Sequence, residues 1–146
     1  KLVVSLSLCA TKSFINEENM MRYAHLAKNL AVAFIQVLEP RAVGHYAGKD
    51  VGLTQKQEKI LEDFYLKMNF DTAYKNMPIV IYHGYTHRRA GCFGAGNCYL
   101  YVDTDGDIHG CPFCRNKSGN VLSSPLEQSI DAVRSAGCQK YEEATI

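Results

Sequence analysis

The sequence predicts an α/β chain in which parallel βα units, forming part of a (β/α) barrel, precede a small cysteine-rich module of a β-hairpin and a helix. Over residues 2–82, short apolar runs alternate with longer stretches whose apolar residues recur at helical spacing. From residue 83 onward the composition changes to glycine, cysteine and short β-branched or aromatic runs. We therefore expect two domains, 1–82 and 83–146, with the boundary in segment 83–90.

The first domain is expected to begin with a strand, a helix and a second strand. Residues 2–8 form a β-branched and leucine run without clean alternation, which is typical of a strand covered on both faces. Asn16 is a candidate N-cap for the helix that follows. Residues 32–38 form the second apolar run, and Glu39-Pro40 ends it because proline has no amide N–H to donate.

A second helix and a third strand complete this domain. Thr54 and Gln57 have the spacing of a capping box, and an apolar stripe follows them. The stripe consists of Ile60, Leu61, Phe64, Tyr65 and Met68. Pro78 bounds the helix, and residues 79–82 form a short strand. The repeated order of strand and helix favours right-handed βα units with parallel strands.

The second domain is expected to contain a hairpin and a helix. Two short runs, 99–102 and 108–110, flank the turn-rich segment 103–107. Ser124-Pro125 then opens a helix that ends near Gly137. The apolar face of this helix holds Leu126, Ile130 and Val133.

Charge and hydropathy argue against two classes of partner. The chain has 16 basic and 15 acidic side chains, and its net charge of +1 provides no field that would gather nucleic acid or an anionic membrane. The apolar run over residues 2–10 is far shorter than the roughly 20 residues that span a bilayer. It also matches a lipoprotein signal poorly, because the bulky Leu8 precedes Cys9. We expect neither nucleic acid nor a membrane as a partner.

The start of the sequence favours a piece of a longer protein. Residue 1 is Lys rather than an initiating Met, and a strand-like run begins at the second residue. No secretory signal is visible, so we expect a cytoplasmic protein. The missing N-terminal half of the same protein is an expected partner. Without it, exposed strand edges would favour self-association of the chain.

The cysteine series is the strongest functional signal. Five of the six cysteines follow residue 90, namely Cys92, Cys98, Cys111, Cys114 and Cys138. The first four are separated by five, twelve and two residues. Thiolates are soft ligands for iron–sulfur clusters and zinc, which need several sulfurs around one point. Cys9, alone in the first strand, is instead expected to be a small buried hydrophobe.

The residues alone leave three causes of this clustering open. An iron–sulfur cluster is favoured, because Gly94-Ala95-Gly96 provides a backbone that can turn tightly and aim amide N–H groups at sulfur. Zinc is the first alternative, and would make the chain a zinc-stabilised, non-catalytic binding module. Disulfides in an intact small α/β domain, secreted or serving in interactions, are the second alternative.

Several short motifs surround these cysteines. They are Gly91-Cys92-Phe93-Gly94-Ala95-Gly96, the hairpin turn Asp105-Gly106-Asp107, the four-residue spacing between Gly106 and Cys111, and Gly119-Asn120-Val121 ahead of a helix. Together they resemble the SPASM or twitch extension of radical S-adenosylmethionine (radical SAM) enzymes, over residues 91–138.

This resemblance implies an auxiliary [4Fe–4S] cluster bound by Cys92, Cys98 and Cys111, with Cys114 or Cys138 as the fourth ligand. The full SPASM pattern has more cysteines and commonly two clusters, so a single cluster is expected here. By the same resemblance, the chain is the C-terminal portion of a radical SAM oxidoreductase. The auxiliary cluster would bind substrate or relay electrons, and the substrate would be a peptide, a protein or a small molecule.

The first domain resembles the last strands and helices of the radical SAM barrel around Leu38-Glu39-Pro40-Arg41-Ala42-Val43-Gly44. Glu39 and Arg41 follow a strand's carboxyl end, so they are candidate residues for binding S-adenosylmethionine or substrate, with a local ion pair as the alternative. The C-x3-C-x2-C motif that holds the catalytic cluster is not in this sequence. S-adenosylmethionine and a second [4Fe–4S] cluster are therefore expected only in the complete enzyme, and this chain alone should be inactive.

Two weaker signals are expected to be structural. Asp103, Asp105 and Asp107 have the spacing that begins a calcium loop, but Gly106 sits one place early and Cys114 occupies the place of the usual Glu. A solvated turn is the preferred interpretation. His83, His87 and His109 are expected to be surface histidines.

Overall fold

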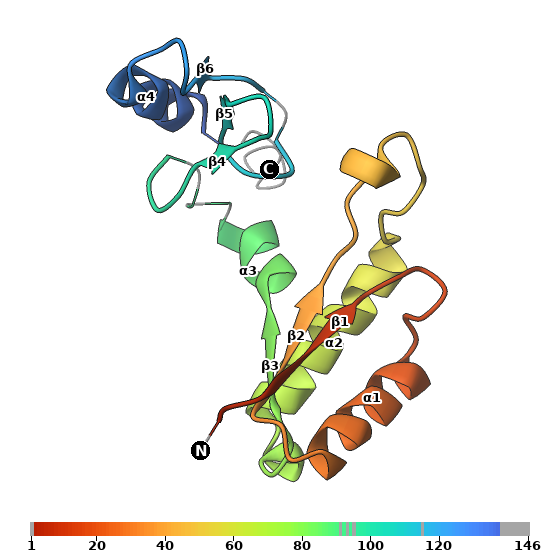
Figure 1. Cartoon of the computed structure of the whole chain (residues 1–146). Helices are drawn as coiled ribbons and strands as arrows, with labels where there is room; N and C mark the ends of the chain where they lie inside the picture. Colours follow the sequence, from red (N-terminus) through yellow and green to blue (C-terminus); the bar gives the residue numbers. More distant parts are fainter. Residues whose placement is uncertain (1, 91, 93, 95, 115, 138–146) are drawn as a thin grey trace. The chain divides into compact units, whose positions relative to one another are not determined.

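The computed structural model describes residues 2–90, 92, 94, 96–114 and 116–137. The chain forms two compact units, Lys1–Tyr85 and Thr86–Ile146. The first contains a parallel three-stranded sheet with helices, and the second contains a small antiparallel three-stranded sheet and a C-terminal helix (Figure 1). The predicted α/β class is confirmed. The described strands do not close a barrel.

The first unit consists of consecutive βα units. Its elements are β1 (Ser5–Cys9), α1 (Glu17–Asn29), β2 (Phe34–Leu38), the short helix η1 (Gly44–Tyr46), α2 (Gln55–Phe70), the short helix η2 (Thr72–Tyr74) and β3 (Ile79–Tyr82). The strands lie side by side in chain order, β1-β2-β3, and both pairs are parallel. The connection from one parallel strand to the next is expected to be right-handed. When such connections join neighbouring strands in chain order, their helices lie on the same face of the sheet, so α1 and α2 are expected to share a face.

Both long helices begin where the sequence predicts. Asn16 caps α1 by accepting a hydrogen bond from the N–H of Asn19 at 2.8 Å. Thr54 accepts from the N–H of Gln57 at 3.3 Å, and the Gln57 side chain accepts from the N–H of Thr54 at 3.2 Å. Since the first N–H groups of a helix have no partner within it, these local contacts define both starting points.

Within the described residues of the first unit, the helices cover one face of the parallel sheet and the other face is open. Leu8, Ile35, Val37, Val80 and Tyr82 are buried in one core with Met20, Ala24, Ala27, Leu61, Phe64 and Met68 of the helices. The alternate residues, none of which is buried, are Ser5, Ser7, Cys9, Phe34, Gln36, Leu38, Ile79 and Ile81.

The expectation that the first strand is covered on both faces was wrong, and so was the expectation that Cys9 is buried. Ser5 and Ser7 alternate with leucines at the period of two that separates the faces of a strand. This alternation places the serines and Cys9 on the open face, where Cys9 is exposed. The paired strand also begins at Ser5, opposite Phe34, and the preceding residues 2–4 are exposed.

The second unit is built on a smaller core. Its elements are the C-terminal part of α3 (His83–Ala90), β4 (Tyr101–Val102), β5 (Asp107–His109), β6 (Gly119–Asn120) and α4 (Leu126–Ala136). The predicted hairpin is present as the antiparallel pair β4–β5. Ile108 and Val133 are its two fully buried core residues within the described part, with Leu100 packed against them.

Three features of this unit differ from expectation. Helix α3 occupies the segment expected to be a linker, because β3 runs directly into it at His83. Strand β6 was not anticipated, since a two-residue strand beginning with Gly119 has no apolar run to mark it. The predicted helix α4 is present, but Leu126 on its expected apolar face is 48% exposed while Ser129 is buried. Ser129 packs directly over Gly119, where an added Cβ would overlap the Ser129 hydroxyl.

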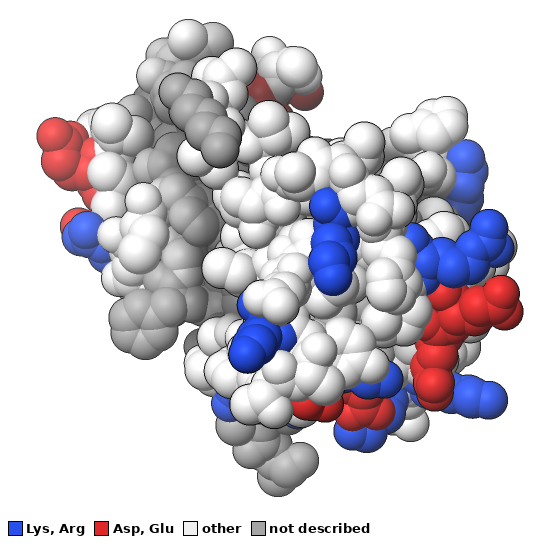
Figure 2. Space-filling model, turned by 90° about the horizontal axis from the view of Figure 1, so that it is seen from below, with Lys and Arg blue, Asp and Glu red and all other residues white. Residues whose placement is uncertain are grey.

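Charged side chains are intermixed on the face drawn in Figure 2. Basic and acidic groups lie side by side there among uncharged residues, in keeping with the net charge of +1. Among the residues described, no helix is both long and apolar enough to cross a bilayer.

Candidate metal centre

Four of the five candidate ligands lie in the described part of the second unit, and each has a free thiol. Cys92 follows α3 and is half-buried, whereas Cys98 is exposed on the loop before β4. Cys111 follows β5 and is buried, and Cys114 is half-buried. The fifth candidate, Cys138, lies outside the described residues.

The donor set fits an iron–sulfur cluster in kind, because four free thiols occupy one small unit and thiolates are the usual ligands of such clusters. Within the described residues, no group of three or more His, Cys, Asp and Glu side chains is arranged to hold a metal ion. Metal sites in small domains commonly form together with ion binding, which draws their loops together. The cysteines therefore stay candidate ligands on their chemistry and spacing.

The glycine loop before β4 is closed by its own backbone. The carbonyl of Gly94 accepts hydrogen bonds from the N–H groups of Asn97, Cys98 and Tyr99 at 3.2, 2.9 and 3.2 Å. The N–H of Gly96 donates to the carbonyl of Tyr99 at 2.9 Å. These four amides stabilise the loop that carries Cys98. The sequence led us to expect amides of the glycine segment to point at sulfur, but the amide of Gly96 donates to a backbone carbonyl instead.

Helix α4 anchors this loop at Gly96. The guanidinium of Arg134 donates from Nε to the Gly96 carbonyl at 2.8 Å. Gly96 has φ of +70°, and a Cβ at this position would lie 2.7 Å from the backbone nitrogen of Arg134. Only glycine allows both this conformation and this close approach.

We expect Gly96→Ala to destabilise the second unit by about 2 kcal/mol or more, because it adds a backbone clash to the roughly 1–2 kcal/mol cost of a left-handed residue. Gly106→Ala is the matched control. Gly106 also has a positive φ, of +80°, but its added Cβ would meet side-chain atoms and no backbone, namely Cγ2 of Val121 at 3.3 Å and the Asn120 amide group at 3.4 Å. Native-state hydrogen exchange of the amides in residues 96–137 would compare the two, and equal losses of stability would contradict the close packing on α4.

The C-x2-C pair forms a tight turn after the hairpin. The N–H of Cys114 donates to the carbonyl of Cys111 at 3.1 Å. Such a turn holds two sulfurs on one short segment, an arrangement common to zinc sites and iron–sulfur sites.

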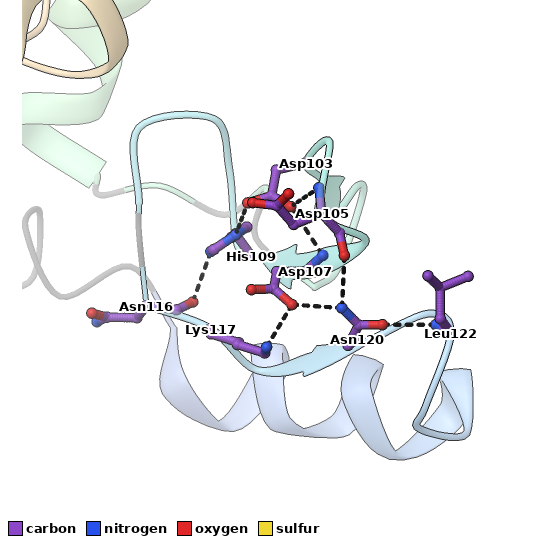
Figure 3. Close-up of polar contacts among 8 residues, drawn as sticks. All are labelled: Asp103, Asp105, Asp107, His109, Asn116, Lys117, Asn120 and Leu122. Atoms are coloured by element: carbon purple, nitrogen blue, oxygen red, sulfur yellow. Dashed lines mark hydrogen bonds and ion pairs between the residues drawn. The ribbon is translucent and has the colours of Figure 1, made fainter.

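His109 stabilises the segment that carries Cys111 and Cys114 through two side-chain contacts (Figure 3). It is 4% exposed, so the expectation of a surface histidine was wrong at this position. Its Nε2 lies 3.0 Å from Oδ2 of Asp103, and its Nδ1 lies 3.3 Å from the carbonyl oxygen of Asn116. The ring therefore joins the hairpin turn to the segment after Cys114. No sequence pattern around His109 marks these two partners, which lie six and seven positions away in the chain.

The aspartates form an ordered turn. Oδ1 of Asp103 accepts hydrogen bonds from the N–H groups of Asp105 and Asp107, both at 3.0 Å. Asp107 in turn contacts Lys117 and Asn120, both at 2.6 Å (Figure 3). Two of the three carboxylates thus have partners within the protein, which supports the turn interpretation over a calcium loop.

These contacts stabilise the charged forms of two carboxyls. The hydrogen bond from His109, helped by the two amides, holds the pKa of Asp103 below its usual value. The hydrogen bonds from Lys117 and Asn120 do the same for the pKa of Asp107. A lowered folded-state pKa means that the stabilisation is present above the unfolded pKa, about 3.9, and is lost as the pH falls through the folded value.

We therefore expect the second unit to lose stability on acidification below about pH 4. Asp103→Asn should reduce stability at neutral pH and make its acid dependence shallower. Asp105→Asn is the control, because the Asp105 side chain is exposed at the same turn. Thermal unfolding between pH 3 and pH 7 is the measurement, and parallel pH profiles for wild type and Asp103→Asn would contradict the assignment.

The other candidate residues lie in the first unit, at the carboxyl end of β2. Oε2 of Glu39 lies 3.5 Å from Nη2 of Arg41, so the local ion pair is present. The Tyr82 hydroxyl, from the end of β3, donates to the other Glu39 oxygen. The Glu39 side chain is only 9% exposed, and a Cβ on Gly84 would overlap its Oε1. Sequence reasoning missed Tyr82, whose only signal is its position at a strand's carboxyl end.

Comparison of the chain with protein-family models, with curated proteins and with solved structures finds no match.

Proposed function

We propose that this chain is the C-terminal portion of a radical SAM oxidoreductase, in which the second unit binds an auxiliary [4Fe–4S] cluster. The observation that carries the proposal is the set of free cysteines around one glycine loop and one hairpin. Cys92 and Cys98 flank Gly94 and Gly96, and Cys111 directly follows β5. This is the arrangement of motifs that resembles the SPASM or twitch extension.

The topology of the first unit supports the same proposal. Its strands follow one another in chain order and its helices pack on one face, as in a (β/α) barrel. This differs from a doubly wound sheet, in which the strand order reverses at a switch point and the helices cover both faces. The open face of Ser5, Ser7, Gln36 and their neighbours would then face the barrel interior, and the missing N-terminal half would supply the remaining strands.

In this proposal Cys92, Cys98 and Cys111 hold the cluster, with Cys114 or Cys138 as the fourth ligand. When bound, the cluster supplies one-electron redox chemistry or an iron site for substrate. Arg134 fixes the loop that carries Cys98, and His109 fixes the segment that carries Cys111 and Cys114. Glu39 and Arg41 lie at the strand end where barrel enzymes bind ligands, so they are proposed to contact S-adenosylmethionine or a peptide, protein or small-molecule substrate in the complete enzyme.

Anaerobic reconstitution with ferrous iron and sulfide tests the cluster. We expect absorbance at the blue end of the visible spectrum, with iron and acid-labile sulfide bound in equal amounts. Cys111→Ser should lose both. Cys9→Ser is the matched control, because Cys9 lies on β1 in the other unit, and it should bind as much iron as the wild type.

A zinc-stabilised binding module is the second candidate function, favoured by the hydrogen-bonded Cys111–Cys114 turn. It predicts stoichiometric zinc, no visible absorbance and no incorporation of iron. Counting thiols under native and reducing conditions distinguishes a disulfide-bonded domain from the two metal-binding alternatives, the iron–sulfur cluster and zinc.

A further inference from the structure

Tyr99 lies against Cys92, a contact that neither the cysteine spacing nor the glycine motif predicts. The Tyr99 hydroxyl is 3.9 Å from the Cys92 sulfur, within the range of a hydrogen bond to sulfur. The two residues stand at opposite ends of the glycine loop. The loop therefore brings a hydroxyl donor to a candidate ligand.

The position of the Tyr99 ring is fixed by the loop itself. The backbone N–H of Tyr99 donates to Gly94, and its carbonyl accepts from Gly96. The ring covers Gly94 so closely that a Cβ there would overlap it. Glycine at position 94 is thus required for the ring to lie where its hydroxyl reaches Cys92.

We infer that Tyr99 is a positioning residue that donates its hydroxyl hydrogen bond to the Cys92 thiolate and raises the reduction potential of the cluster. This inference rests on the proposed function. A cluster that accepts one electron gains negative charge, which spreads over its sulfur ligands. A hydrogen bond to one of these sulfurs stabilises the reduced form more than the oxidised form, and no proton needs to move.

Tyr99→Phe tests the inference, because it removes the hydroxyl and keeps the ring that packs on Gly94. Tyr101→Phe is the matched control, because it also removes a tyrosine hydroxyl from the second unit. Tyr101 lies on β4 beside the His109 ring, with ring centroids 6.1 Å apart. Both variants and the wild type are reconstituted with iron and sulfide, and the cluster is titrated with a reductant while its electron paramagnetic resonance signal is recorded. Iron and sulfide contents are measured in parallel.

We expect Tyr99→Phe to bind wild-type amounts of iron and sulfide with a reduction potential shifted to a lower value, and Tyr101→Phe to match the wild type. Equal potentials in all three proteins would overturn the role of Tyr99 and leave the proposed function standing. A wild-type chain that takes up no iron and sulfide would overturn both. A variant of Tyr99 that loses the cluster altogether would also overturn the inference, because it assigns the hydroxyl to tuning and not to assembly.

Discussion

Replacing Cys111 by alanine is expected to abolish cluster binding and to loosen residues 96–114. Cys111 is 8% exposed and follows β5, so it is both a candidate ligand and part of the small interior of the second unit. Among the described residues, the core there consists of Ile108, Val133 and Leu100, which is little apolar surface to order a glycine loop and a hairpin. Binding at a site that is absent from the unfolded chain would supply the missing stabilisation.

Native-state hydrogen exchange measures this effect region by region. In the reconstituted protein, we expect amide protection in residues 96–114 to exceed that of Cys111→Ala by roughly tenfold or more, the equivalent of about 1.4 kcal/mol. The α/β unit should exchange equally in both. Cys9→Ala provides the control for cysteine removal, and chelation of the metal should reproduce the Cys111→Ala pattern. Equal protection of residues 96–114 with and without metal would mean that the cysteines do not stabilise this segment by binding metal.

The second large effect is expected for Ile35→Ala in the central strand β2. Ile35 is fully buried at 0% exposure between the sheet and the helices. Loss of a buried isoleucine side chain removes apolar burial and leaves a cavity, at a cost of about 2–5 kcal/mol. Denaturant unfolding of the first unit should show this loss as a lower midpoint with little change in slope.

Ile79→Ala is the matched comparison, because Ile79 begins β3 on the open face and is 64% exposed. We expect its cost to stay below about 1 kcal/mol in the isolated chain. Similar losses for both isoleucines would mean that the open face is covered, by self-association or otherwise. Repeating the pair over a range of protein concentrations separates these cases, since coverage by a second copy depends on concentration.

The local signals of the sequence predicted the elements well where the elements depend on neighbours in the chain. Asn16 and the Thr54–Gln57 pair mark the starts of α1 and α2 because a cap acts over three residues. Gly137 follows the end of α4 for the same reason. The helix α3 lacked such a signal, since β3 passes into it without an intervening loop.

The candidate site likewise has features that the sequence shows and contacts that it does not show. The spacing of Cys92, Cys98, Cys111 and Cys114 is visible in the sequence, and so is the need for a flexible backbone at Gly96. The partners of that backbone are not visible. Arg134 is 38 positions away from Gly96 in the chain, and only the packing of α4 on the loop brings them together.

By itself, the sequence determined the order of the strands and helices apart from α3 and β6, the caps of α1 and α2, and the presence of a group of cysteines, which are candidate metal ligands. Tertiary structure decided the rest. It left one face of the parallel sheet open, buried His109 between Asp103 and Asn116, and set the Tyr99 hydroxyl beside Cys92. The physical reason is that caps and turns form between residues a few positions apart and follow from local sequence. Burial depends on which segments pack together, and the side-chain contacts of His109 and Tyr99, to residues six or seven positions away, depend on how the loops fold back.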